Sequence, residues 1–194
     1  MKDKPVTELA AAFHHLPAFM PYYPVGCPSL PVSIDVIEAL AHGGADLIEV
    51  GVPFSDPLAD GPVIQHATQI ALQQGATVAG CLDAVAELRR RGVGVPLVLM
   101  GYYNPLLAFG LARLAQTAAA AGASGFIVPD LPPEEAGDLE AVLGPAGLPL
   151  VRMLAPTTEP AHAARIVRDC SSLLPGIRSR PIRSRRLRCP GWKN

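Results

Sequence analysis

The sequence predicts an α/β protein built on a parallel β-sheet, and two observations support this prediction. Five short apolar runs, each of strand length, alternate with segments of helical spacing. These runs are apolar on both faces, which is typical of parallel strands covered by helices. Because crossovers between parallel strands are right-handed, the main alternatives are an open doubly wound sheet and a closed eight-stranded barrel.

The expected elements follow one another in a regular order. The five expected strands lie within residues 18–26, 46–52, 95–102, 125–130 and 148–156. The helical segments between and after them lie within 29–44, in a long region that ends near 92, and within 105–122, 132–144 and 158–170. Gly92 and Gly122 stand where helices should end. Asn104 followed by Pro105 is typical of an N-cap and a first helical residue.

Length and composition indicate a globular domain. The chain has 194 residues and is 49% apolar, enough for a sizeable core. No apolar run reaches the roughly 18 residues of a membrane span, and the first 16 residues lack the core of a signal peptide, so we expect a cytoplasmic location. The histidines show no ligand spacing and no metal site is expected. Four scattered cysteines are expected to be free thiols: Cys27, Cys81, Cys170 and Cys189.

The charges are distributed unevenly. Residues 1–170 hold 9 bases and 17 acids, whereas 171–194 hold 7 bases and no acid. The last segment also lacks a strand-length apolar run and a helical period. We therefore expect a folded domain over 1–170 and a disordered basic tail over 171–194. An acidic body with a basic tail can mark a nucleic-acid or membrane arm, but we expect neither nucleic acid nor membrane as a partner here. The run Arg89 to Arg91 closes a helix, where cations suit the helix dipole and solvent, and is not expected to form a binding patch.

The second expected strand carries a carboxylate, Glu49. Taking an ionised side chain out of water costs several kcal/mol unless it is paired or functional. Alternation along the strand puts Ile48, Val50 and Val52 on one face, which suits burial under helices. Glu49 lies on the other face near the strand's carboxyl end, with Gly51 beside it to make room. Enzymes of the α/β class place catalytic groups at that end.

Further polar residues follow the expected strands. Asp56 and Asp60 lie in the loop after Glu49, and Tyr102 and Asp130 end the third and fourth strands. Taken singly, the aspartates suit a turn or a helix cap, and Tyr102 suits core packing. Together at strand ends they favour a site. Since no nucleotide, metal or nucleophile-elbow motif is present, a metal-free and nucleotide-free acid–base enzyme is the simplest expectation.

Several long segments resemble one known family. EVGVPFSDPLADGPVIQ, which begins at Glu49, is similar to the signature of the tryptophan synthase alpha subunit. PLVLMGYYNPLLAFG, GFIVPDLPPEEA and LAPTT follow in the family's order. MPYYPVGCPSL resembles its first strand and loop, although Val25 and Cys27 depart from the commoner residues. The resemblance covers about residues 18–170.

This resemblance implies a TIM-type (β/α) barrel, incomplete, with about five of eight βα units. It also implies a lyase of tryptophan biosynthesis that cleaves indole-3-glycerol phosphate to indole and glyceraldehyde 3-phosphate by a retro-aldol reaction. The matching positions make Glu49 the general acid/base and Asp60 the carboxylate that faces the indole N–H. The implied substrate-binding residues are Phe54, Ile64, Met100, Tyr102 and Ile127, with Asp130 at the rim.

The resemblance also implies a partner. Residues 53–60 and 103–109 would face a beta subunit in an alpha2-beta2 heterotetramer, with Asp56, Pro57 and Asn104 at the contact. Pyridoxal phosphate belongs to that beta subunit in the family, so no cofactor is expected in this chain. A barrel aldolase is the third interpretation, but the only lysines are Lys2, Lys4 and Lys193, all near the termini.

Beyond Cys170 the resemblance ends. The family's glycine-rich phosphate loops have no counterpart in the tail, whose composition is typical of translation in a wrong frame or of a truncation. Losing two or three phosphate hydrogen bonds, each about 1.5–3 kcal/mol, would lower kcat/KM by more than about a thousandfold. We therefore expect weak or no activity, unpaired edge strands, an inner face that meets water, and an unstable or aggregating chain. The alternative is a non-catalytic fragment or docking module for the beta subunit.

Overall fold

A five-stranded parallel sheet forms the centre of the molecule, seen in a computed structural model that describes residues 9, 12–13, 17–153, 157–159, 161 and 166. The strands are β1 (Tyr22–Pro24), β2 (Ile48–Gly51), β3 (Leu97–Met100), β4 (Gly125–Ile127) and β5 (Leu150–Val151). The helices are α2 (Leu30–His42), α3 (Pro62–Gln73), α4 (Val78–Arg90), α5 (Tyr103–Phe109), α6 (Leu111–Ala121) and α7 (Gly137–Leu143), with a 3-10 turn η1 (Pro133–Glu135).

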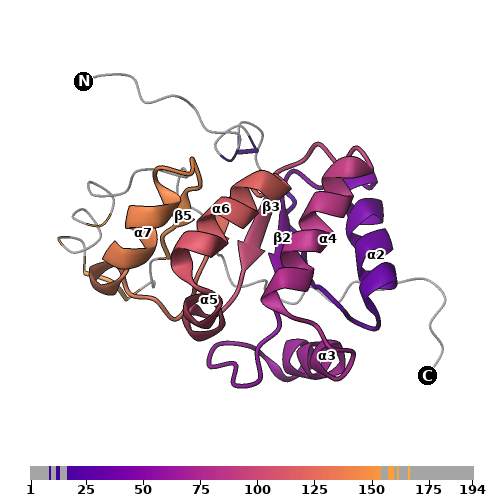
Figure 1. Cartoon of the computed structure of the whole chain (residues 1–194), viewed down its shortest axis with the longest axis horizontal. Helices are drawn as coiled ribbons and strands as arrows, with labels where there is room; N and C mark the ends of the chain where they lie inside the picture. Colours follow the sequence, from indigo (N-terminus) through magenta and orange to yellow (C-terminus); the bar gives the residue numbers. More distant parts are fainter. Residues whose placement is uncertain are drawn as a thin grey trace.

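The strand order is that of a (β/α) barrel. Each strand pairs in parallel with the next one along the chain, in the order β1-β2-β3-β4-β5. A doubly wound sheet would reverse its order at a switch point, so this order excludes the open alternative. The helices α2, α4, α6 and α7 contact one another in sequence along one face of the sheet (Figure 1). The expectation of about five βα units of a barrel is confirmed.

The face of the sheet under the helices holds the main core. Ile48, Val50 and Val52 are buried there, together with Val85 and Leu88 of α4. The alternation expected along β2 is therefore confirmed. Fully burying a side chain of this size contributes about 1.5–3 kcal/mol, which makes this face the principal source of stability.

The opposite face of the sheet, which would line a barrel, holds a smaller apolar cluster. Leu47, Val98 and Ile127 lie on it and pack with Leu9 and Phe13, which precede the first strand in the sequence. Leu9 and Phe13 are both buried. The expectation that the inner face meets water is therefore wrong at these residues, because apolar side chains from before β1 cover them.

Glycines with positive φ divide two regions that the sequence presents as continuous. The region before residue 92 splits into α3 and α4 near Gly75, whose φ is 80°. Thr77 then caps α4, since its hydroxyl accepts a hydrogen bond from the Gly80 N–H at 3.1 Å. Gly110, with φ 95°, separates α5 from α6. Gly122 ends α6 in the left-handed conformation, as expected from the sequence.

The start of α5 corrects an expectation. Asn104 is not its N-cap, because the helix begins at Tyr103. The Asp130 carboxylate, which follows β4, accepts hydrogen bonds from the Tyr103 N–H at 3.0 and 3.2 Å. Asp130 thus caps a helix, but it caps α5 from a neighbouring unit and not the helix that follows it in the sequence. This contact ties the end of β4 to the end of β3.

The arginine run also differs from its expected role at one position. Arg89 points into the structure and donates to Val93 O at 2.6 Å and Val95 O at 2.8 Å. It also donates to Gly122 O at 2.9 Å. It therefore joins the end of α4 to the segments that enter β3 and β4. Arg90 and Arg91 keep the expected surface position and pair with Glu87.

Several expectations concern residues outside those described. They include the tail 171–194, Cys170, Cys189 and most of the fifth expected helix. In the described part of the chain, Cys27 and Cys81 are free, and no group of three or more His, Cys, Asp or Glu side chains could hold a metal ion. No helix among the described residues is both long and apolar enough to span a bilayer.

Candidate active site

A small cavity lies at the carboxyl ends of the first four strands. It contains Asp60, an aromatic wall and the ends of the inner strand faces. Its lining residues are Tyr22, Val52, Phe54, Asp60, Thr68, Met100, Gly101, Tyr102 and Pro129. Three of the residues expected at a substrate pocket, Phe54, Met100 and Tyr102, therefore line the same cavity as Asp60.

Glu49 lies on the inner face of β2 and does not line this cavity. It pairs in register with Tyr22 on one side and Val98 on the other, and its backbone N–H donates to Pro21 O at 2.9 Å. The side chain is half-buried, and this burial raises the pKa of the Glu49 carboxyl above its ordinary value. A carboxyl group in such surroundings can hold a proton at a higher pH than in water, which suits a general acid/base.

The glycine beside Glu49 serves a different side chain from the one expected. A Cβ atom at Gly51 would lie 2.3 Å from the Tyr22 hydroxyl oxygen and 2.5 Å from the ring carbon that bears it. Gly51 therefore makes room for the ring of Tyr22, which crosses over β2, and not for Glu49. The expectation named the correct glycine but the wrong neighbour, because the next strand's side chain cannot be seen in a single strand's alternation.

Asp60 is placed by contacts with tyrosines. Tyr102 shares a side-chain hydrogen bond with Asp60, and its hydroxyl oxygen accepts a hydrogen bond from the Ala59 N–H at 2.9 Å. Phe54 packs against Tyr102 with ring centroids 5.6 Å apart. Burial, and then the charge of Asp60, raise the pKa of Tyr22, so its phenol stays protonated. The helix-cap interpretation of Asp60 is wrong, since Gly61 is the N-cap of α3 and no side chain caps this helix.

Two lining residues escaped the sequence analysis. Tyr22 of β1 and Thr68 of α3 both line the cavity. Thr68 is one of two buried polar residues among all the residues described. A side-chain hydrogen bond joins them. Tyr22 could have been found as a tyrosine within the first expected strand, although that strand contains two. Thr68 carries no signal in a sequence, because the helix that bears it reads as an ordinary amphipathic segment.

The other expected site residues are dispersed around this cavity. Ile127 is buried in the inner cluster, and Ile64 is half-buried on α3; neither lines the cavity that contains Asp60. On the loop after β2, Asp56 is exposed and accepts a hydrogen bond from the Ser55 hydroxyl, and Pro57 is half-buried. Asn104 is exposed on α5.

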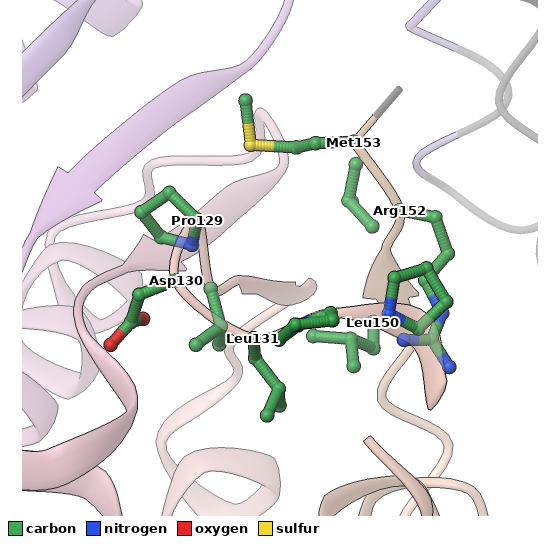
Figure 2. Close-up of a pocket in the computed structure, with 10 residues that line it drawn as sticks. Pro129, Asp130, Leu131, Leu150, Arg152 and Met153 are labelled. Carbon is green, nitrogen blue, oxygen red and sulfur yellow. The ribbon is translucent and has the colours of Figure 1, made fainter. Parts of the chain in front are cut away.

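A second pocket opens at the ends of β4 and β5 (Figure 2). It is lined by residues 128–133 and 150–153, with Asp130 and Arg152 on opposite sides. Arg152 forms an ion pair with Glu140 of α7. Its Nη1 atom is buried and has no hydrogen-bond partner among the described residues. Asp130, at the rim, is already engaged with the N–H of Tyr103.

Fold and site together define the class of protein: part of a parallel (β/α) barrel with two carboxylates at the strand ends. Residues 10–174 match the sequence model of the family described as tryptophan synthase alpha chain. The tryptophan synthase alpha chain of Chloroflexus aurantiacus is 52% identical over 157 residues, which are 81% of this chain and 59% of that protein. That of Roseiflexus castenholzii is 51% identical, over 81% of this chain and 60% of that protein.

Solved structures support the same family assignment. The alpha subunit of tryptophan synthase from Legionella pneumophila superposes with a TM-score of 0.79 at 34% identity, over 85% of this chain and 65% of that one. A tryptophan synthase from M. tuberculosis in an aminoacrylate-bound form gives 0.79 at 37% identity, over 84% and 68%. The chain belongs to the tryptophan synthase alpha chain family. It spans about three fifths of the length of the curated relatives given above.

Proposed function

We propose that this chain carries the lyase site that cleaves indole-3-glycerol phosphate to indole and glyceraldehyde 3-phosphate in tryptophan biosynthesis. The observation that carries the proposal is the pairing of two unlike carboxylates. Asp60 lines a small cavity with Tyr22, Phe54 and Tyr102, and Glu49 lies half-buried on the inner face of β2. Family membership supports the same reaction.

Each carboxylate has a role that the chemistry requires. Cleaving the carbon–carbon bond needs a proton at indole C3 and removal of a proton from the glycerol hydroxyl, and Glu49 would perform these transfers. Its raised pKa brings the group closer to neutral pH, where a general acid/base is most effective. Asp60, held by Tyr102, would accept the hydrogen bond of the ring N–H as positive charge develops there.

The substrate-binding set follows from the cavity and its surroundings. Phe54, Met100 and Tyr102 would contact the indole ring, since they line the cavity around Asp60. We assign further contacts with the substrate to Ile64 and Ile127, and the rim to Asp130. No cofactor is proposed for this chain, because acid–base groups suffice for the reaction. Pyridoxal phosphate would belong to a beta subunit in an alpha2-beta2 heterotetramer, and the location would be cytoplasmic.

The test is indole release from indole-3-glycerol phosphate by the purified 194-residue chain, with and without a tryptophan synthase beta subunit. Cleavage should disappear in Glu49→Gln and fall steeply in Asp60→Asn. Asp83→Asn, a charge-matched change at an exposed position on α4, should leave the rate unchanged. Cleavage that survives Glu49→Gln would remove the assignment of the general acid/base.

A second candidate function is docking to the beta subunit without catalysis, and exposed apolar residues favour it. Leu58, in the loop after β2, is 83% exposed, and Leu107 on α5 is 50% exposed. Both lie in the segments expected to face the partner, near Asp56, Pro57 and Asn104. Large apolar side chains left in water on adjoining segments mark interaction surfaces.

Docking can be measured by capture of this chain on an immobilised beta subunit. Leu58→Asp and Leu107→Asp should each weaken capture at least tenfold, because a charge would enter an apolar contact. Val32→Asp on α2, which is 41% exposed, is the matched control and should not change it. A folded chain that is captured but does not cleave its substrate would favour docking over catalysis.

A further inference from the structure

Tyr22 is half-buried and lines the cavity that contains Asp60, and the reaction proposed above does not use its hydroxyl. The residue lies on β1 in register with Glu49, and its ring lies over Gly51, where a side chain of any size would collide with it. The backbone of β2 is thus shaped to admit this ring. Its side chain is one of those that line the cavity.

Asp60 and Thr68 are the two polar groups that act most strongly on this hydroxyl. Thr68 of α3, a buried residue that is 4% exposed, shares a side-chain hydrogen bond with it. Asp60 lies close enough for its charge to be the strongest influence on the Tyr22 phenol after burial itself. A threonine hydroxyl can donate to the phenol oxygen while the phenol keeps its own proton for another acceptor. Among the groups that act on Tyr22, Asp60 is the carboxylate, and it lines the same cavity as the phenol.

Asp60 would then be bounded by two phenols. Tyr102 holds it from the end of β3, and Tyr22 faces it from β1. A carboxylate in a loop can rotate about its own side-chain bonds, so donors on two sides restrict which oxygen points into the cavity. Hydrogen bonds to an ionised carboxylate are among the stronger ones available for such orientation.

We propose that Tyr22, held in place by Thr68, is a positioning residue that orients the Asp60 carboxylate toward the ring N–H of a bound indole. This inference rests on the proposed function for its ligand, but the orientation of Asp60 can be measured without any ligand. If the role of Tyr22 were purely structural, its ring would only pack over Gly51 and would not affect the orientation of the Asp60 carboxylate.

The first measurement is the carboxyl carbon resonance of Asp60 in the full chain, assigned with Asp60→Asn. Tyr22→Phe keeps the ring over Gly51 and removes only the hydroxyl, and Thr68→Val removes the group that holds it. Both should shift the Asp60 resonance. Tyr23→Phe is the matched control: its hydroxyl donates to Cys27 O at 3.0 Å and its side chain packs against the helix-side core. It should leave Asp60 unchanged.

The second measurement compares the affinities for indole and for 1-methylindole, which has no ring N–H. The folded wild-type chain should prefer indole. Tyr22→Phe should reduce this preference about fivefold, the effect of one misplaced hydrogen bond, and Thr68→Val should act in the same direction. Combining both changes should add little to Tyr22→Phe alone, because Thr68 acts through Tyr22.

The outcomes separate the two proposals. A wild-type chain that does not prefer indole to 1-methylindole would overturn the role of Asp60 in the proposed function, whatever the resonance of Asp60 shows. An Asp60 resonance that is the same in wild type, Tyr22→Phe and Thr68→Val would overturn the positioning role, even if indole binds well. A shift in both variants with an unchanged preference for indole would also overturn it, since orientation would then not reach the ligand.

Discussion

Arg89 offers the most stringent test of how this sheet is held together. Its guanidinium donates to Val93 O, Val95 O and Gly122 O at 2.6–2.9 Å, and to the Ser124 hydroxyl at 3.1 Å. Its stem also packs on Gly122, where a Cβ atom would lie 3.0 Å from the Arg89 Cγ. The change Arg89→Met keeps most of that stem and removes every donor.

The expected cost follows from these contacts. A hydrogen bond from a charged donor contributes about 1.5–3 kcal/mol. Because Arg89 is half-buried, water can replace part of what is lost, so the four bonds together are expected to contribute about 3 kcal/mol and not their sum. For a chain of this size, 1 kcal/mol lowers Tm by about 2–4 °C, which gives a fall of roughly 6–12 °C.

The assay is thermal unfolding followed by circular dichroism. Arg90→Met is the control, since the neighbouring arginine has the same chemistry but a side chain that is 73% exposed and pairs with Glu87 on the surface. It should leave Tm nearly unchanged. If the two variants melt within about 2 °C of each other, the reasoning that the Arg89 bonds join β3 and β4 at their amino ends is refuted.

Three further changes test the site and its supports. Gly51→Ala would force the Tyr22 ring aside, at a cost of about 1–3 kcal/mol in urea unfolding and with weaker indole binding, whereas Gly94→Ala, with open space around it, should cost nearly nothing. Glu49→Gln should have a higher Tm than wild type at neutral pH but not below about pH 4.5. The folded state holds the Glu49 proton more tightly than the unfolded chain does, so wild-type stability falls as pH rises above about 4.5. Asp130→Ala removes the cap of α5 and should lower the free energy of unfolding by about 1 kcal/mol, measured in urea.

Local patterns in the sequence were sufficient to predict the main layers of the fold. The alternation of branched residues along β2 placed Ile48, Val50 and Val52 under the helices, because side chains in a strand alternate whatever the rest of the chain does. Gly122 was identified as a helix end for a similarly local reason. The breaks at Gly75 and Gly110 were missed, since an isolated glycine within an apolar helical pattern is tolerated and gives no certain sign of a break.

The details of the site depended on contacts between distant segments. Asp130 was expected to cap its own following helix, but it binds the N–H of Tyr103, which is 27 residues away. Gly51 was expected to make room for Glu49, but it admits Tyr22 from another strand. In both cases the residue type indicated the kind of role, but the sequence did not indicate which residue it contacts. That partner is decided by the pairing of strands and not by neighbours in sequence.

The two carboxylates differ in what fixes their positions. The Glu49 N–H donates to Pro21 O, and β2 is paired with β1 and β3, so the position of Glu49 is built into the sheet. Asp60 lies on a loop, and its carboxylate depends on side chains from other elements. A directed-evolution library aimed at new ring systems should therefore vary the loop and the tyrosines around Asp60. Changes along β2 would displace the proton-transfer group together with the fold that carries it.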